Sequence, residues 1–376
     1  MNDPGAPTRL DLPPREVAAS QTGATLIREL DEDLVARLGL SHEARQLYEA
    51  SDVLDLHIDS YIPTRLFGYD LRKRHGRGLF GARLYSHADF PRVRDAGLTG
   101  GIWAITTNPF RTGAGRERAF FRNLEALLEL LRNTEGVALA RNAADYRAAR
   151  ARGEHAVFVG IQGGNALSHD LDAFDRIPDR ALLQVTLMHM TPSELGSTST
   201  PLPGFPDRGL GRLGDAYVRA LAANRILIDL AHASEQTFYD VVAIADRSVP
   251  LIVTHAGVRA VYPHWRNLSD RQLRCIADTD GTVGVIFHSH YLGAGARGRR
   301  AETIVDHLEH IVQSVGEDHA SLGSDWDGMI LTPRDMPTCL ELPILVEKML
   351  SRGFSPDCVQ KILGGNALRV IERARG

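Results

Sequence analysis

Histidine and acidic side chains follow short apolar runs throughout this chain of 376 residues. They stand in the segments LDLHIDS (His57, Asp59), LMHMT (His189), LAHAS (His232), VTHAG (His255), FHSH (His288, His290) and SDWDG (Asp325, Asp327). Imidazole and carboxylate groups are the ligands that divalent metals such as zinc take from proteins. In the first run, the His-x-Asp spacing places both side chains on one face of an extended strand. We therefore expect a divalent metal site where the ends of these runs come together.

The apolar runs predict the elements that bring these residues together. Eight strand candidates cover residues 53–57, 101–105, 156–161, 183–188, 226–230, 250–254, 282–287 and 320–323. Their Val, Ile and Leu content is typical of strands buried on both faces of a parallel sheet. Helical patterns separate several of them, at residues 116–132, 213–224, 235–246, 270–278, 302–315 and 340–351. This alternation predicts a (β/α)8 TIM barrel, in which all strands end at one shared mouth.

One barrel accounts for nearly the whole chain. Residues 1–24 are polar and rich in proline, so we predict a flexible N-terminal arm there. Residues 25–376 are predicted to form a single metal-dependent barrel domain, and a helical pattern at residues 25–38 is expected to cap its bottom. Two long connections, residues 60–90 and 191–212, show no clear element. Both follow strand ends, so we expect them to border the mouth.

The composition narrows the possible binding partners of the protein and its cellular compartment. Lys and Arg total 43 and Asp and Glu total 47, a net charge of −4, which predicts no nucleic-acid partner. No apolar run is long enough to predict a membrane span, and the first residues lack the basic and apolar regions of a secretory leader. The three cysteines are scattered without metal-ligand or redox spacing. Together these features predict a cytoplasmic protein.

Several motifs also resemble, in their order along the chain, those of a known family. The resemblance is to the membrane (renal) dipeptidases, which are zinc metallopeptidases with amidohydrolase-like barrels. It covers residues 50–372 through the segments LDLHIDS, ADFPRVRDAGLTGGIWAI, VGIQGGNAL, LIDLAHAS, IVTHAG, RNLSD, LGSDWDG and LGGNALRV. It implies an amidohydrolase-like TIM barrel with zinc as cofactor, which cleaves a small dipeptide or related amide with a free carboxylate. A homodimer, common in the family, is also implied.

This resemblance assigns a separate role to each site residue. One zinc would be held by His57, Asp59 and Asp325 and a second by His232 and His255, with a hydroxide between them. His189 would stabilise the oxyanion formed from the substrate, and Asp325 would also act as general base. Arg266, in HWRNLSD, would bind the substrate carboxylate, a task that suits a planar guanidinium. The alternative for Arg266 is a surface salt bridge.

One position departs from the family pattern. Members of the family carry a glutamate that bridges both metals in GxEGGHS, whereas this chain has Gln162 in GIQGGNA, and Asn165 replaces the histidine that follows. An amide offers one neutral oxygen in place of two anionic ones. We therefore expect one firmly bound zinc and a second that is weak or absent, with Gln162 as a weak or non-bridging ligand. In the alternative, His288 or His290 compensates for the lost carboxylate.

Three functions remain open from the sequence. The first is a dipeptidase-like hydrolase that uses metal-activated water. The second is a non-hydrolytic biosynthetic enzyme on the same scaffold, such as an isomerase, lyase or tautomerase, because a fold does not determine its chemistry. The third is a catalytically inactive binding barrel, which the retained His189 and metal-ligand set disfavour.

Overall fold

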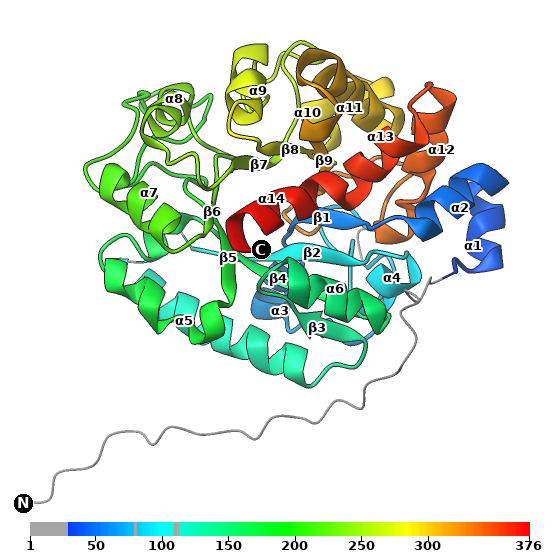
Figure 1. Cartoon of the computed structure of the whole chain (residues 1–376), viewed down its shortest axis with the longest axis horizontal. Helices are drawn as coiled ribbons and strands as arrows, with labels where there is room; N and C mark the ends of the chain where they lie inside the picture. Colours follow the sequence, from blue (N-terminus) through cyan, green and yellow to red (C-terminus); the bar gives the residue numbers. More distant parts are fainter. Residues whose placement is uncertain (1–28, 79–80, 109–110, 112) are drawn as a thin grey trace, which may run out of the picture.

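Eight parallel strands form a closed barrel in the computed structural model of the chain (Figure 1), which describes residues 29–78, 81–108, 111 and 113–376. The described residues contain nine strands, all of which except β3 belong to the barrel: β1 Leu54–Ile58, β2 Gly100–Thr106, β3 Val137–Leu139, β4 His155–Gln162, β5 Leu182–Thr186, β6 Leu227–Asp229, β7 Leu251–Ala256, β8 Thr282–Val285 and β9 Ala320–Leu322. The ring has the order β2-β1-β9-β8-β7-β6-β5-β4, and a parallel β2–β4 pairing closes it. The predicted (β/α)8 TIM barrel is confirmed. The predicted arm at residues 1–24 lies outside the described residues.

Each predicted barrel strand is present, with its ends displaced by at most two residues. The sequence did not predict β3. This strand pairs with the start of β4, whereas β5 pairs with β4 only from Val159 onward. β3 is therefore an edge strand that extends the sheet beside β4 and is not part of the ring. Three residues are too few to show the alternation by which a strand is recognised.

Helices surround the barrel and cover its outer face (Figure 1). They are α1 Glu32–Leu38, α2 His42–Ala50, α3 Tyr61–Phe67, α4 Phe90–Asp95, α5 Gly113–Arg132, α6 Ala143–Ala151, α7 Gly214–Ala223, α8 Glu235–Ile244, α9 Asp270–Ala277, α10 Ser289–Leu292, α11 Glu302–Val315, α12 Ile344–Ser351, α13 Pro356–Gln360 and α14 Asn366–Arg375. Side-chain caps begin several of them; Ser269 and Gln272 form a capping box on α9. Among the described residues, no helix has the length and apolarity needed to cross a bilayer.

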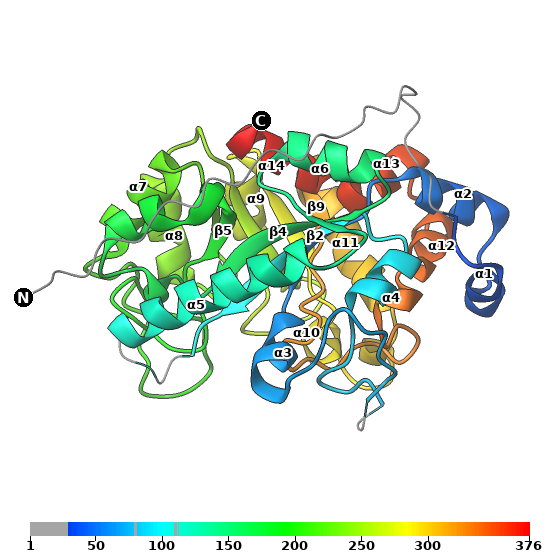
Figure 2. The same ribbon diagram turned by 90° about the horizontal axis from the view of Figure 1, so that it is seen from below.

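The N-terminal end of the barrel is closed by α14 and not by α1, which lies within the helix predicted at residues 25–38; residues 25–28 lie outside the described residues. Arg375 donates to the carbonyl of Leu182 (2.6 Å) at the start of β5, and Arg369 donates to the carbonyl of Asp318 (2.5 Å) before β9. The apolar face of α14 shares a core cluster with residues of β1, β2, β4, β6 and β7. In contrast, α1 lies beside α2, which packs on α12 at the periphery. Figure 2 shows α14 on one side of the strands and α3 and α10 on the other.

The long connection after β1 is more ordered than expected. Residues 60–90 were expected to lack a clear element, and this is wrong in part because α3 follows β1 directly. The fully buried carboxylate of Asp327, after β9, accepts hydrogen bonds from the hydroxyl of Ser60 and from the backbone N–H of His87 (2.9 Å). The Asp327 side chain therefore holds both ends of the connection after β1 at the mouth of the barrel.

The second long connection, residues 191–212, contains no helix or strand, as predicted. It is nevertheless tied to the end of β6. The hydroxyl of Thr198 and the backbone N–H of Ser199 both donate to the carbonyl of His232, at 2.9 and 2.7 Å. This connection therefore helps to position a histidine that the sequence places in the metal site.

Candidate metal centre and active site

The predicted site residues converge at the C-terminal mouth of the barrel. They come from six strands: His57 and Asp59 from the end of β1, Gln162 from β4, His189 from after β5, His232 from after β6, His255 from β7 and Asp325 from after β9. His189, His232 and Asp325 each follow their strand by three residues. Parallel strands of a barrel end at the same face, so polar residues at these positions must meet.

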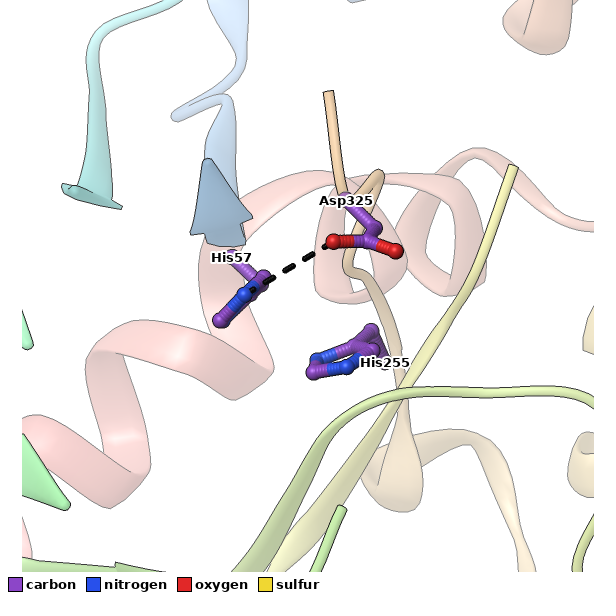
Figure 3. Close-up of side chains that lie close together, drawn as sticks. All are labelled: His57, His255 and Asp325. Carbon is purple, nitrogen blue, oxygen red and sulfur yellow. Dashed lines mark ion pairs between the residues drawn. The ribbon is translucent and has the colours of Figure 1, made fainter. Parts of the chain in front are cut away.

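The tightest group consists of His57, His255 and Asp325 (Figure 3). One ligand-type atom from each lies within 4.8 Å of the others, and all three residues are buried. Nε2 of His57 is 3.8 Å from Oδ1 of Asp325 and 3.7 Å from Oδ2 of Asp59. The three residues expected to hold the first metal are therefore together, and His255 of the second predicted half-site lies beside them.

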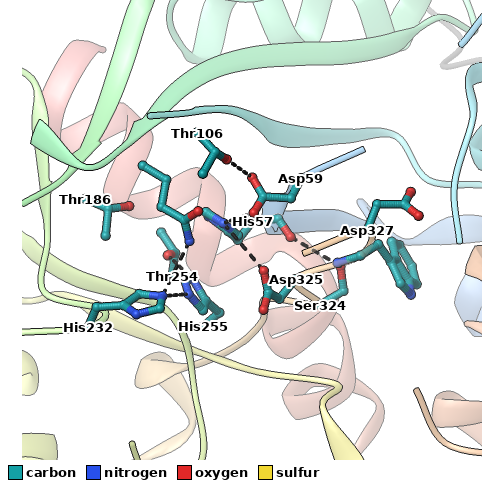
Figure 4. A network of polar contacts seen from close by, with 12 residues as sticks. His57, Asp59, Thr106, Thr186, His232, Thr254, His255, Ser324, Asp325 and Asp327 are labelled. Carbon is teal, nitrogen blue, oxygen red and sulfur yellow. Dashed lines mark hydrogen bonds and ion pairs between the residues drawn. The ribbon is translucent and has the colours of Figure 1, made fainter. Parts of the chain in front are cut away.

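Further side chains extend this group on the β4–β6 side (Figure 4). Nε2 of His232 is 2.9 Å from Nε2 of His255, and the side-chain nitrogen of Gln162 is 3.4 Å from the same His232 atom. The ring of His189 lies 4.9 Å from that of His232, centroid to centroid. The structure thus joins the predicted metal ligands and His189 in one continuous cluster.

Two members of the cluster have backbone conformations that residues other than glycine rarely adopt. The φ angles of His232 and Asp325 are 64° and 63°, in the left-handed region. Such conformations cost about 1–3 kcal/mol each and concentrate at functional sites. Both residues lie just beyond a strand end, where the turn of the backbone directs their side chains into the mouth.

Buried atoms without partners indicate that a cation fits this cluster. Neither ring nitrogen of His57 has a hydrogen-bond partner among the described residues, and the same holds for Oε1 of Gln162. Leaving such an atom unsatisfied costs about 1–3 kcal/mol. A divalent cation would satisfy a His57 lone pair and the amide oxygen. Imidazole nitrogens with carboxylate oxygens form a donor set that suits zinc.

The electrostatics of the cluster favour neutral imidazoles and a cation. Burial lowers the pKa of His189 to about 4, and it lowers the pKa values of His232 and His255 well below their usual range. Burial acts in the same direction on His57, but the carboxylates of Asp59 and Asp325 outweigh it and raise the pKa of His57 to about 9. Positive charge is therefore stabilised at His57, where a proton and a metal ion compete for the same nitrogen.

Arg266 lies beside the cluster with an unmatched charge. It is 4% exposed, and its Nη2 donates to the carbonyl of His255 at 3.3 Å. Its Nε has no hydrogen-bond partner, and within the described chain no carboxylate lies at ion-pair distance from it. Burial lowers the pKa of the Arg266 guanidinium. The alternative that Arg266 forms a surface salt bridge is wrong, because the side chain is neither exposed nor paired.

Comparison with known proteins agrees with this arrangement. The sequence model of the membrane dipeptidase family, peptidase family M19, matches residues 41–375. The chain belongs to this family. It is 37% identical over 177 residues to an uncharacterized Klebsiella pneumoniae protein from the pqqA 5′ region; the match covers 45% of this chain and 64% of that relative.

Solved structures show the membrane dipeptidase fold over nearly the whole described chain. A dipeptidase described as an M19 metallopeptidase is 29% identical with a TM-score of 0.74, covering 87% of this chain and 99% of that one. A Rhodobacter sphaeroides metallopeptidase, bound to a phosphinate mimic of the dipeptide L-Ala-D-Ala, is 27% identical with a TM-score of 0.74, covering 86% and 99%. By family, the chain is a metal-dependent, dipeptidase-like hydrolase.

His288 and His290 do not join the metal cluster of this chain. Nδ1 of His288 accepts a hydrogen bond from the backbone N–H of Leu331 (3.1 Å), and its ring packs against Tyr291. His290 is exposed on α10. Among the described residues, neither belongs to the group that could hold a metal. The alternative in which they replace the bridging carboxylate of the family therefore has no support in the geometry.

A buried relay behind His255 was missed from the sequence. Nδ1 of His255 lies 2.8 Å from the hydroxyl of Thr254, which donates to Oδ2 of Asp229 at 2.6 Å. Asp229 is fully buried and also accepts from Gln184 (2.9 Å) and Thr186 (2.6 Å). With Nδ1 donating to Thr254, Nε2 of His255 presents its lone pair to the cluster. An aspartate inside the apolar run LID was the signal available in the sequence.

We expect Thr254→Val to weaken zinc binding at the half-site of His255, which fills only at high zinc concentration, about tenfold to a hundredfold, the usual effect of losing a partner behind a metal ligand. Valine keeps the shape of threonine but removes the acceptor for His255. Zinc affinity is measured by competition with a chromophoric chelator. Thr282→Val is the matched control, because the Thr282 hydroxyl is also buried but bonds Ser321 (2.7 Å) away from the cluster. Equal zinc affinity in both variants would contradict the relay.

Proposed function

We propose that the chain hydrolyses a small dipeptide or related amide with a free carboxylate, using water activated by zinc. The observation that carries the proposal is the buried guanidinium of Arg266, which lies next to the cluster without a carboxylate partner. A buried charge is costly unless it is paired, so this arrangement calls for an anion from outside the chain. The phosphinate dipeptide mimic bound to the Rhodobacter relative agrees with a dipeptide as substrate.

The proposed metal ligands divide into a strong and a weak set. His57, Asp59 and Asp325 would hold one zinc firmly, whereas His232 and His255, with only the amide of Gln162, would bind a second weakly or not at all. Zinc in such a site lowers the pKa of a water molecule and polarises a carbonyl. Thr106 donates to Oδ1 of Asp59 at 2.6 Å, which orients that carboxylate toward His57.

The residues of the chain then position the substrate and move the proton. Arg266 binds the substrate carboxylate through two parallel N–H bonds and so sets the register of the scissile amide over the cluster. His189 is neutral at pH 7 and donates its N–H to the oxyanion that forms on the carbonyl. Asp325 takes the proton from water and delivers it to the leaving amine.

A second candidate function rests on Gln162 alone. Without the bridging carboxylate, the site has less anionic charge for a two-metal mechanism, and this favours a non-hydrolytic isomerase, lyase or tautomerase on the same barrel. The two candidates differ in whether water is consumed. Mass analysis of products formed in ¹⁸O-labelled water separates them, because only hydrolysis transfers the label to the new carboxylate.

The hydrolytic function is tested with the zinc-loaded protein and the dipeptides Ala-Ala and Ala-D-Ala. We expect release of free amino acids, loss of at least about 99% of the rate after dialysis against a chelator, and recovery with zinc, because the metal generates the nucleophile at neutral pH. Chelator already saturated with zinc is the control. Cleavage that survives metal removal, or no cleavage of any dipeptide, would overturn the proposal.

A further inference from the structure

A second concentration of unpaired arginines lies outside the metal cluster. A cavity of about 270 Å³ between α3 and α5, above the end of β2, is lined by Arg65, Arg111, Arg116 and Arg122. We refer to it as the arginine cavity. Within the described chain, no carboxylate lies at ion-pair distance from any of these four side chains.

Local charge makes this cavity strongly cationic. Residues 105–122 carry four arginines and one glutamate, so their net charge is 4 − 1 = +3, in a chain whose net charge is −4. The single acidic residue of this segment, Glu117, forms an ion pair with Arg176 (2.7 Å). Residues 109, 110 and 112 of the same segment are Pro, Phe and Thr and bring no charge. Arg111 and Arg122 are exposed and Arg65 and Arg116 are half-buried, so water screens part of the repulsion among the four charges, and an anion placed among them would lower it further.

The local fold holds some of these arginines in place. Nη1 of Arg65 donates to the carbonyl of Thr106 at 2.6 Å, and Nη1 of Arg116 donates to the carbonyl of Arg111 at 2.5 Å. Each guanidinium has five N–H donors. Arg116 makes a second backbone bond, from Nε to the carbonyl of Asn165 (3.4 Å). These bonds order both side chains and leave most of their donors free for a carboxylate or phosphate.

The arginine cavity lies next to the metal cluster, because one residue contacts both. Thr106 lines the cavity, and its hydroxyl donates to Asp59 of the cluster at 2.6 Å. In the ring, β2 and β7 are four steps apart in either direction. The cavity at β2 and Arg266 after β7 are therefore on opposite sides of the mouth, with the cluster between them.

We propose that the arginine cavity binds an acidic side chain on the substrate residue that precedes the scissile bond. A substrate with its C-terminal carboxylate on Arg266 and its amide at the cluster directs its other end toward β2. An aspartyl or glutamyl residue there meets the unpaired guanidinium groups. This inference rests on the proposed dipeptidase function and adds a preference for an acidic first residue.

The test compares Glu-Ala with Gln-Ala, which have the same size and differ by one charge. We expect kcat/KM to be about tenfold to a hundredfold higher for Glu-Ala, the range of charge-assisted hydrogen bonds. In the double variant Arg116→Gln/Arg122→Gln, which keeps Arg65 and Arg111, the ratio should fall toward one, and in Arg122→Gln to an intermediate value. A general loss of activity affects both substrates alike and leaves the ratio unchanged.

A matched control comes from the same helix. Arg118→Gln/Arg132→Gln makes the same change in net charge on α5, and neither arginine lines the cavity. Arg118 is exposed, and Arg132 forms a surface pair with Glu129 at 3.1 Å. The control double variant should keep the wild-type preference. A ratio that falls equally in both double variants would show a long-range charge effect and would overturn the assignment of the cavity.

Other outcomes separate this inference from the proposed function. Cleavage of both dipeptides at equal rates would overturn the acidic preference and leave the hydrolase intact. If neither is cleaved, calorimetry with the zinc-loaded protein decides: tighter binding of Glu-Ala that is lost in Arg116→Gln/Arg122→Gln supports the cavity while the hydrolytic function fails. Tight binding of inorganic phosphate that depends on the same arginines, without a preference for Glu-Ala, would overturn the assignment to substrate.

Discussion

Arg266→Ala should lower kcat/KM for a dipeptide by a factor between about 30 and several thousand, with the zinc content of the wild type retained. Removing one partner of a buried charge pair costs about 2–5 kcal/mol, which converts to that range. The side chain bonds only the carbonyl of His255 within the described chain, so its remaining donors are available to the substrate. Steady-state kinetics and elemental analysis of the same preparation measure both quantities.

Conservative and control variants sharpen this prediction. Arg266→Lys should also have a low kcat/KM, because an ammonium group cannot form the two parallel hydrogen bonds that a planar guanidinium makes to a carboxylate. His189→Ala should abolish turnover while zinc content stays unchanged. Arg259→Ala is the control: Arg259 lies in the same loop but is 41% exposed and already pairs with Glu235 at 3.6 Å, so its loss should change kcat/KM little. Loss of zinc in Arg266→Ala or His189→Ala would show that these residues support the metal site and do not contact substrate.

Gln162→Glu should raise the metal content from one zinc per chain to two. Metal ions in two-metal sites lie about 3.5–4 Å apart, and their mutual repulsion at that distance is large even when screened. Oε1 of Gln162 is buried and unpartnered, and its amide lies 3.4 Å from His232, so a carboxylate placed there adds negative charge beside the weak half-site. Elemental analysis after identical dialysis without chelator gives the stoichiometry.

The control for this prediction adds the same negative charge at a nearby residue. Asn165→Asp adds a carboxylate three residues away, in the short helical turn after β4, and should leave the content at one zinc. The wild type should fill its second half-site only at high zinc concentration. Two tightly bound metals in the wild type would contradict the prediction and would remove the reason to consider a non-hydrolytic reaction.

The barrel and its candidate metal ligands were largely predictable from the sequence. Buried parallel strands have continuous apolar runs, so eight such runs determine a closed ring with few alternatives. Once the ring is closed, residues just after strand ends must share one mouth, whatever the details of packing. For this reason, the placement of His57, His232, His255 and Asp325 followed from their positions in the sequence alone.

Tertiary structure decided the features that depend on contacts between distant segments. The three-residue strand β3 and the closure of the barrel bottom by α14 carry no periodic signal of their own, because long-range pairing and packing produce them. The buried state of Arg266 and the position of His288 outside the cluster depend on how the connections pack at the mouth. The relay from His255 through Thr254 to Asp229 depends on the register between β6 and β7. A sequence pattern shows that a residue is charged, but whether that charge has a partner depends on which segments the fold brings beside it.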